Sequence, residues 1–393
     1  MSERVAGVGG VAEGRFARFE LISWWDQSRL ARARILLVGV GALGNEILKN
    51  LALLGVGHVL LVDLDRVEHS NLSRSILFRP EDCGQFKAEI AARRAREIYP
   101  EMCVRPICGN ALYDLGLGPY RWADVVMAGL DNREARVAIN RAAARAGKVW
   151  IDGAIERLDG VARVFHPATG PCYECTMSEL DWKILASRRS CALLTREEME
   201  AGKVPTTPTT ASVVAAVQCQ EAVKWIHGLE TLAGRGFVFE GTSHRSHAVT
   251  YTRRDDCPSH EVDEPVEALP WRAAEARVGD LLERVRSDLG PDAVVETNND
   301  LLGALHCPRC DRTEQLWTSL GKVTEPQARC PRCGADRTPR LVHLIDGKDP
   351  ILDRSLLDIG IPPWDVVAGR SGMNQRFYEL AGDREEVLGP EME

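Results

Sequence analysis

The first residues with possible chemistry form a glycine-rich segment, GVGALG, in which Gly39, Gly41 and Gly44 follow an apolar run in the pattern G-x-G-x-x-G. Glycines let the backbone approach phosphate oxygens closely, and the free N–H groups at the start of a following helix attract negative charge. Asp63 ends the next apolar run, about 20 residues beyond Gly44, where a carboxylate can bind ribose hydroxyls. The pattern predicts a nucleotide site, and these four residues fit NAD and ATP equally well.

Cysteine pairs form a second group of residues with possible chemistry. The chain has 12 cysteines, and CxxC pairs outside a small secreted protein point to metal before disulfides. CYEC and CPSH predict a tetrahedral zinc set, although an ordinary surface histidine remains an alternative for the last ligand: Cys172, Cys175, Cys257 and His260. Two later CPRC knuckles, about 20 residues apart, predict a zinc ribbon: Cys307, Cys310, Cys330 and Cys333. Four protein ligands leave no open position, so both sites would be structural.

The elements that must position these residues alternate in type along the chain. Apolar runs predict strands at 35–38, 58–63, 123–127 and 149–152, and amphipathic spacing predicts helices after Gly44 and at 87–99, 133–147 and 211–227. Such alternation is typical of an α/β fold, a Rossmann-like doubly wound sheet with mainly parallel strands. We expect this domain to span 1–262, with an irregular crossover at about 177–208, and Thr209 or Thr210 to cap the last helix.

The segment after Asp63 resembles the ubiquitin-activating-enzyme-like (ThiF/MoeB/HesA) adenylyltransferase family. The family pattern D-x-D-x-V-x-x-S-N-L-x-R, an aromatic residue and G-x-x-K-A is matched in register by Asp63, Asp65, Val67, Ser70, Asn71, Leu72, Arg74, Phe78, Gly84, Lys87 and Ala88. Further matches are RFARFE, GLDNREAR, CYEC and VPTTPTTAS, so the resemblance covers about residues 14–260. One departure is Ser75, where the family usually has glutamine.

The resemblance implies an ATP site that adenylates a carboxylate, a reaction that needs positioning and charge neutralisation. Arg74 and Lys87 would contact the phosphates, Asp131 would hold Mg²⁺ with Asn132 beside it, and Asn71 would bind a phosphate or the ribose. The carboxylates Asp63 and Asp65 complete the expected nucleotide site. Arg18 occupies the place of an arginine that reaches the ATP of the partner subunit, which implies a homodimer.

Thioester-forming members of the family carry a cysteine in the crossover, and Cys191 lies there in the segment RRSC. Two neighbouring arginines would favour its thiolate. An incidental loop cysteine is the alternative. The other unpaired cysteines fit packing better, since Cys219 lies on an apolar helix face.

The C-terminal region differs in pattern from the rest of the chain. An acidic stretch at 261–270 predicts a linker, 278–289 predicts a helix and 293–297 predicts a strand. We expect 270–393 to be a small α+β module that contains the zinc ribbon. The run at 356–367 is similar to the end of a β-grasp (ubiquitin-fold) domain, in which one final strand follows a short turn. A plain zinc-stabilised cap or a dimerisation element is the alternative.

Composition excludes several classes of protein. The net charge is −8, so no overall positive field draws the chain to nucleic acid or to an anionic membrane. The charged N-terminus carries no apolar signal segment, and the longest apolar stretch is too short to cross a bilayer. We therefore expect a soluble, cytoplasmic protein.

Together these features predict an ATP-dependent enzyme that adenylates the C-terminal glycine of a ubiquitin-like protein and transfers it to Cys191 as a thioester, for a conjugating enzyme in a bacterial system. The main alternative is a sulfur-carrier adenylyltransferase (ThiS/MoaD type) without a thioester step. A nicotinamide oxidoreductase has no use for Arg74, Lys87 and Asp131 at these spacings, and a non-catalytic zinc scaffold would lack adenylation.

Overall fold

Short apolar runs form the centre of the first sheet. The computed structural model describes residues 14–167, 169–183, 205–390 and 392. Eight strands pair in the order β3-β2-β1-β4-β5-β6-β7-β8, and the first five of this order run parallel. Their bounds are β1 Arg34–Val38, β2 His58–Val62, β3 Cys103–Ile107, β4 Val125–Gly129, β5 Trp150–Glu156, β6 Asp159–Phe165, β7 Arg235–Glu240 and β8 Arg245–Thr250.

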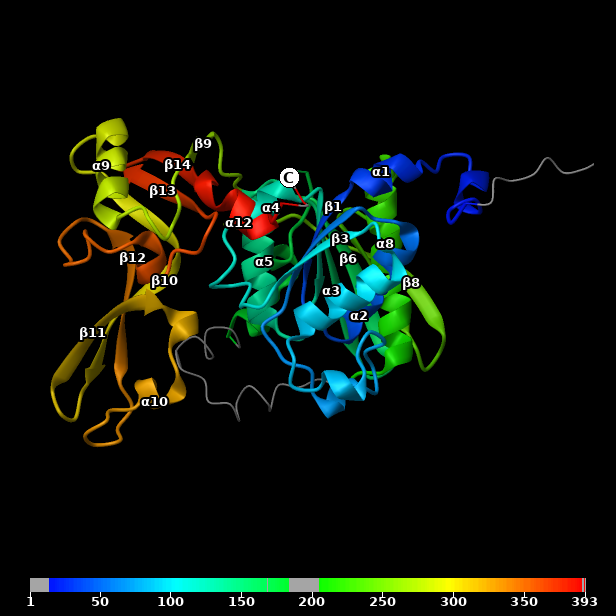
Figure 1. The fold of residues 1–393 in the computed structure, drawn as a ribbon, viewed down its shortest axis with the longest axis horizontal. Helices are drawn as coiled ribbons and strands as arrows, with labels where there is room; N and C mark the ends of the chain where they lie inside the picture. Colours follow the sequence, from blue (N-terminus) through cyan, green and yellow to red (C-terminus); the bar gives the residue numbers. More distant parts are fainter. Residues whose placement is uncertain (1–13, 168, 184–204, 391, 393) are drawn as a thin grey trace, which may run out of the picture.

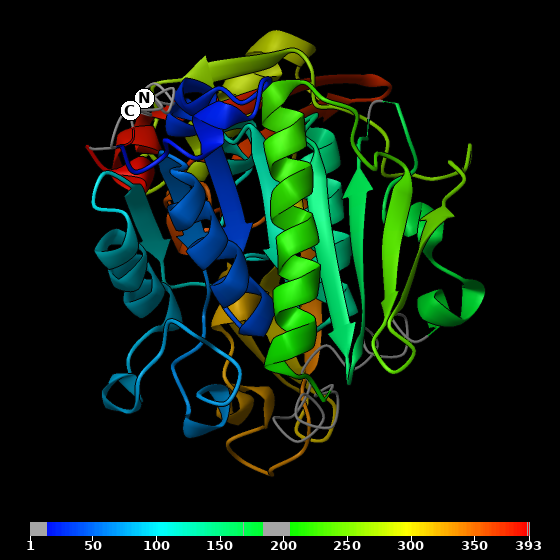
Figure 2. The same cartoon turned by 90° about the vertical axis from the view of Figure 1, so that its right-hand side faces the viewer.

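Helices cover both faces of this sheet. Alternate side chains of β1 enter different cores, because Ile35 and Leu37 pack on one side and Leu36 and Val38 on the other. One face carries α2, α3 and α8, which lie in front of the strands in Figure 2, and α4 and α5 lie on the other face (Figure 1). The helices of this part are α1 Gln27–Arg32, α2 Ala42–Leu54, α3 Lys87–Ile98, α4 Gly118–Trp122, α5 Arg133–Arg145 and α8 Pro208–His227, with 3-10 turns η1 Phe19–Leu21, η2 His69–Asn71, η3 Pro80–Asp82 and η4 Glu174–Thr176. This arrangement confirms the predicted doubly wound, mainly parallel sheet.

The start of α8 differs from the prediction. Its cap is Thr207, whose side chain accepts a hydrogen bond from the Thr210 N–H, and not Thr209 or Thr210. Pro208 at the first helical position has no N–H to satisfy and a backbone φ suited to a helix, so the helix begins earlier than its apolar pattern. Gly228 ends the helix in the left-handed conformation, as expected.

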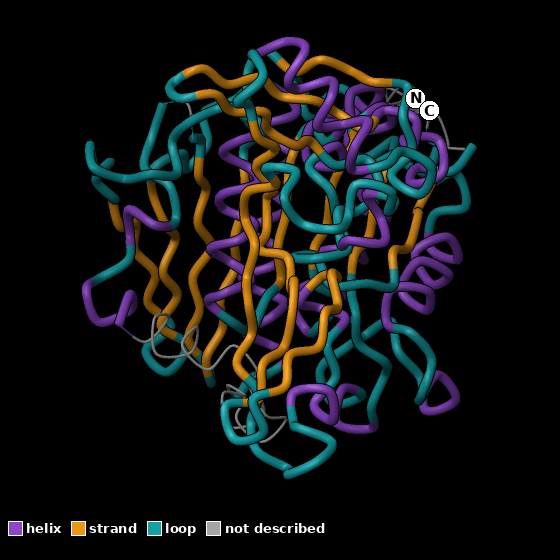
Figure 3. The backbone as a smooth tube through the Cα atoms, turned by 90° about the vertical axis from the view of Figure 1, so that its left-hand side faces the viewer, coloured by secondary structure: helices purple, strands orange, loops and turns teal. Residues whose placement is uncertain are grey.

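The second sheet contains the C-terminal strands in the order β11-β10-β13-β14-β9, with β12 paired to β10. Figure 3 views the molecule from the side of this sheet, and its long strands run across the front. Its elements are β9 Val266–Leu269, α9 Val278–Leu289, β10 Val294–Cys307, β11 Arg312–Ser319, η5 Leu320–Lys322, α10 Glu325–Ala328, β12 Thr338–Ile345, α11 Leu356–Ile359, β13 Val366–Ser371, β14 Asn374–Leu380, η6 Ala381–Asp383 and α12 Arg384–Leu388.

Two expectations for this region are wrong in detail. The strand expected at 293–297 continues to Cys307, because after a break in register between Glu296 and Leu301 it pairs with both β11 and β12. Two strands, β13 and β14, follow α11 instead of one. The helix at 278–289 has the predicted bounds.

A shared core joins the two sheets. Trp364, Val366 and Leu388 pack in the same hydrophobic cluster as Tyr120 and Trp122 of α4. The carboxylate of Asp365 accepts the Leu117 N–H at 2.9 Å and the Asn298 side chain at 2.7 Å.

The stretch expected as a linker at 261–270 is instead part of the fold, because 266–269 forms β9 and Asp263 contacts α5. The carboxylate of Asp263 is buried and pairs with the guanidinium of Arg145 at the end of α5. The segment around Asp263 therefore packs on α5, because its acidic side chain finds a basic partner there.

No helix in the described ranges has the length and apolar character needed to cross a membrane.

Burial raises the pKa of Asp365 from 3.8 to about 6. The folded protein then binds more protons than the unfolded chain between these values, so Asp365 lowers the free energy of unfolding as the pH rises from about 4 to 6, by up to about 3 kcal/mol. Asp365→Asn keeps an oxygen acceptor without the charge and should remove this pH dependence. Urea unfolding at pH 4 to 7 measures it, with Asp292→Asn, an exposed loop residue, as the control. An identical pH profile for Asp365→Asn and the unsubstituted protein would contradict the assignment.

Candidate functional site

The glycine turn lies where the strand order reverses between β1 and β4, and ligands of open α/β sheets bind outside the carboxyl ends of such strands. Gly39 adopts a positive φ of 88°, which favours glycine. A Cβ on Gly44 would lie 1.9 Å from the Gly39 carbonyl oxygen, and one on Gly129 would lie 2.7 Å from the Gly44 nitrogen. The turn after β1 and the end of β4 are therefore in backbone contact. Gly41 occupies the N-cap position of α2.

Asp63 braces this turn. One carboxylate oxygen accepts the Val40 N–H at 2.6 Å, and the other accepts the Asp65 N–H at 2.8 Å. Burial raises the pKa of Asp63, and the nearby Lys87 ammonium offsets part of this rise. The structure thus places the predicted ribose carboxylate directly at the predicted phosphate loop.

Lys87 and Asp65 meet beside Asp63. The Lys87 ammonium lies 2.8 Å from an Asp65 carboxylate oxygen, and Lys87 is buried at 8% exposure at the first position of α3. A buried cation that is paired with a half-exposed carboxylate can exchange that partner for a phosphate oxygen without a change of charge balance. The pair therefore suits an anionic ligand.

Arg74 and Asn71 lie on the loop between β2 and α3. The Arg74 guanidinium donates to the Ser70 carbonyl oxygen at 2.6 Å. Asn71 is buried, and its side-chain oxygen accepts the Glu68 N–H at 2.9 Å. In this structure Asn71 therefore builds the loop that carries Arg74. Its contact with a phosphate or ribose remains a prediction.

Asp131 and Asn132 follow β4. Asn132 caps α5, since its side-chain oxygen accepts the Ala135 N–H at 2.8 Å, and its amide donates to Asp131 at 3.3 Å. Asp131 is exposed. An exposed carboxylate near the carboxyl end of a central strand is an oxygen ligand of the kind that Mg²⁺ prefers.

Two further site residues, Arg18 and Cys191, are predicted from the sequence. Arg18 is exposed and immediately precedes η1. Cys191 lies outside the described residues.

The first cysteine group forms a compact donor set. Cys172, Cys175, Cys257 and His260 offer ligand atoms that all lie within 4.8 Å of one another and could hold a metal ion. The Cys172 and Cys257 sulfurs are 3.5 Å apart, and the Cys175 sulfur is 3.2 Å from the His260 Nε2. Sulfur and imidazole donors in this number suit zinc.

The second cysteine group lies at the carboxyl end of β10. Cys307, Cys310, Cys330 and Cys333 are also within 4.8 Å of one another. The Cys307 and Cys333 sulfurs are 3.6 Å apart. This group too could hold a metal ion.

The sequence patterns did not reveal the buried ion pairs near the Asp131 turn and near the first cysteine group. Asp152 on β5 is fully buried and pairs with Arg136 and Arg163. Glu174, between the cysteines of CYEC, is buried and pairs with Arg141. Arg136 stands in the matched segment GLDNREAR, and that match was the available signal.

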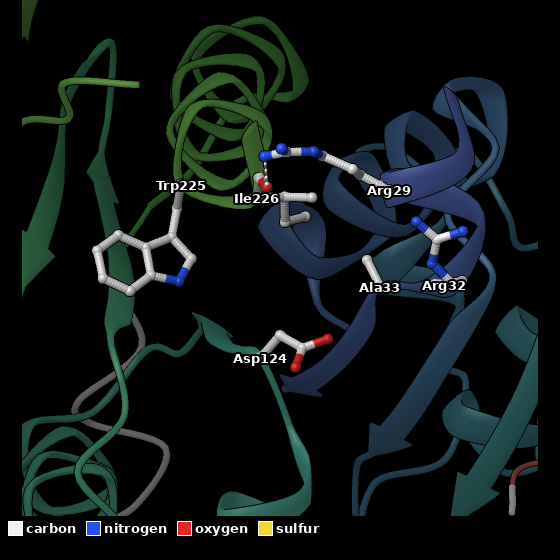
Figure 4. A pocket seen from close by; sticks show the side chains of 6 residues that line it. All are labelled: Arg29, Arg32, Ala33, Asp124, Trp225 and Ile226. Carbon is white, nitrogen blue, oxygen red and sulfur yellow. Dashed lines mark hydrogen bonds between the residues drawn. The ribbon is translucent and has the colours of Figure 1, made fainter. Parts of the chain in front are cut away.

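A shallow pocket of about 370 Å³ lies at the opposite end of the sheet. Trp225 faces Arg29, Arg32 and Asp124 across it, and Arg29 donates to the Ile226 carbonyl oxygen at 3.4 Å (Figure 4). Ala33 and Asp124 precede β1 and β4, so the pocket lies away from the glycine turn.

Comparison with known proteins identifies the family of this chain. The model of the ThiF family matches residues 14–259, and the chain belongs to this family. Over 238 residues it is 34% identical to a sulfur carrier protein adenylyltransferase of Thermus thermophilus, covering 59% of this chain and 83% of that protein. Over 244 residues it is 32% identical to a SAMP-activating enzyme E1 of Haloferax volcanii, covering 59% and 82%. The protein is an E1-like adenylyltransferase.

A solved structure shares the fold. A crystal structure of E. coli MccB with ATP aligns with a TM-score of 0.52 at 23% identity, over 64% of this chain and 76% of that chain. The second sheet, from Val266 onward, lies outside the residues matched by the family.

Proposed function

We propose that this protein activates a ubiquitin-like protein by adenylating its C-terminal glycine. The supporting observation is that Asp63, Asp65 and Lys87 lie together at the glycine turn. Asp131 follows β4, the strand that pairs with β1. The likeness to a sulfur carrier protein adenylyltransferase and to an activating enzyme E1 supports the same reaction class.

The reaction joins two anions. A carboxylate oxygen of the carrier's last glycine attacks the α-phosphorus of ATP, the bond to the β-phosphate oxygen breaks, and pyrophosphate leaves. Arg74 and Lys87 would offset the charge on the phosphates. Asp131, with an exposed carboxylate, fits Mg²⁺, which when bound neutralises phosphate charge.

We further propose a second step at Cys191. Its thiolate would attack the acyl carbon of the adenylate, so that a thioester forms and AMP leaves. The C-terminal module extends beyond the family match, and a module of this kind could recruit a conjugating enzyme in a bacterial ubiquitin-like system. The same proposal includes two domains, at 1–262 and 270–393, and a β-grasp fold for the second. It also includes a homodimer in which Arg18 reaches the partner's ATP.

The second candidate is a sulfur-carrier adenylyltransferase without the thioester step. The 34% identical Thermus thermophilus relative favours it. Both candidates share the adenylation site and differ in the thioester step at Cys191 and in the role of the C-terminal module.

Zinc is the proposed occupant of both cysteine groups. Their sulfur and imidazole donors fit it, and closed four-ligand sets would stabilise the fold without taking part in the reaction.

The adenylation proposal predicts pyrophosphate exchange into ATP that depends on a small β-grasp protein ending in Gly-Gly. Lys87→Met and Arg74→Ala should each lower the exchange rate by about 100-fold or more, because they remove charge at the phosphates. Lys322→Met, an exposed lysine on η5, is the matched control and should keep the full rate. Exchange that survives both site substitutions would refute the assignment.

The thioester proposal predicts a carrier adduct on non-reducing gels that dithiothreitol cleaves. Cys191→Ala should abolish the adduct while pyrophosphate exchange continues. Cys103→Ala, which removes a partly buried thiol at the amino end of β3, should leave the adduct intact. Active exchange without any adduct would instead support the sulfur-carrier candidate.

The metal proposal predicts two zinc ions per chain by mass spectrometry of the purified protein. Cys310→Ser should lower this to one and lower the melting temperature, since the ribbon would lose a ligand. Cys108→Ser is the control and should retain both ions. A zinc-free, equally stable protein would exclude a structural role for the metal.

A further inference from the structure

Asp131 has little side-chain support of its own. Within the described part of the chain, its one recorded side-chain contact is the 3.3 Å hydrogen bond from Asn132. The position of its carboxylate therefore depends on the backbone of the short turn between β4 and α5, which begins with Leu130.

Arg136 holds that turn from the face of the sheet covered by α5. It lies one helical turn beyond the cap residue Asn132, so both side chains share one side of α5. The Arg136 Nη2 donates to the Leu130 carbonyl oxygen and, at 3.0 Å, to the Gly153 carbonyl oxygen of β5. One guanidinium thus ties the residue before Asp131 to the neighbouring strand.

A buried carboxylate anchors this guanidinium. The Arg136 Nε donates to one oxygen of Asp152 at 3.0 Å, and the Arg163 Nε donates to the other oxygen at 2.9 Å. Asp152 is fully buried and the Arg136 side chain is 8% exposed. Loss of Arg136 would leave a Leu130 acceptor and an Asp152 oxygen without their partner, which is costly in a buried place. The arrangement therefore orients Arg136 firmly.

Gln218 contacts the same two strands, β4 and β5, from the opposite face of the sheet. It is fully buried on α8, and its amide donates to the carbonyl oxygens of Ala128 at 3.0 Å and Ile151 at 3.3 Å. Its side-chain oxygen has no hydrogen-bond partner among the described residues and lies 2.3 Å from where a Cβ on Gly153 would be. Polar side chains from both helical layers therefore contact the carboxyl end of β4 and the part of β5 that pairs with it.

We propose that Arg136 is a positioning residue that fixes the Asp131 carboxylate for its metal ion, with Asp152 as its anchor and Gln218 as a second support. The inference rests on the proposed function, because it takes Asp131 as the Mg²⁺ ligand. Arg136 acts through the backbone of Leu130 and contacts neither ATP nor the carrier.

The test measures the Mg²⁺ concentration that gives half-saturation of ATP binding, by calorimetry on the full chain with ATP and MgCl₂ alone. Arg136→Lys keeps the charge beside Asp152 but cannot make the fork of three bonds. We expect this concentration to rise by about 10-fold or more, as for other residues that orient a metal ligand. Gln218→Leu, which retains the side-chain volume and removes the amide bonds, should give a smaller rise.

The matched control is Arg141→Lys. Arg141 lies on the same helix and pairs with the buried Glu174, so its substitution disturbs a comparable ion pair without touching Leu130. It should lower the melting temperature and leave the Mg²⁺ dependence unchanged. An unchanged Mg²⁺ dependence in both Arg136→Lys and Gln218→Leu, with a shift in Asp131→Asn, overturns the positioning role alone. An unsubstituted protein that does not bind ATP with Mg²⁺, or an Asp131→Asn variant without a shift, overturns the proposed function itself.

Discussion

The candidate nucleotide site depends on one constraint, the direct backbone contact between the glycine turn and the end of β4. Gly39, Gly44 and Gly129 leave no room for a side chain between the two turns. Because the turns touch, the start of α2 and Asp131 lie at the same edge of the sheet, where open α/β sheets bind ligands. A phosphate chain and its metal ion require this proximity, since each balances the charge of the other.

Helix α5 connects this crevice to the rest of the molecule. Its first turn holds the Asp131 loop through Asn132 and Arg136. Its middle holds the CYEC knuckle, because the Asn140 side chain accepts the Tyr173 N–H at 2.8 Å and Arg141 pairs with Glu174. A metal ion in the first cysteine group would therefore stabilise the same helix that positions Asp131.

The second sheet is joined to the first by burial of both apolar and polar groups. Tryptophan and valine side chains of β13 and its preceding turn enter the core beneath α4. The Arg145 guanidinium at the end of α5 contacts both Asp263 and, at 2.6 Å, Asn298 of β10. The second sheet is therefore in direct contact with α5, the helix that follows the Asp131 loop.

The amino-acid sequence alone determined the alternation of strands and helices, the glycine turn and the two cysteine groups. Each of these features depends on residues that are close together in the chain, so their spacing is visible in the sequence. It predicted the bounds of α9 and the start of α3 at Lys87, and Asp63, which it placed at the end of a strand, directly follows β2. The tertiary structure alone decided that Asp152 joins Arg136 to Arg163, that Asp263 packs on α5 and that β9 pairs with β14. The reason is that a buried charge is stable only beside its partner, and which partner it meets depends on how distant segments pack.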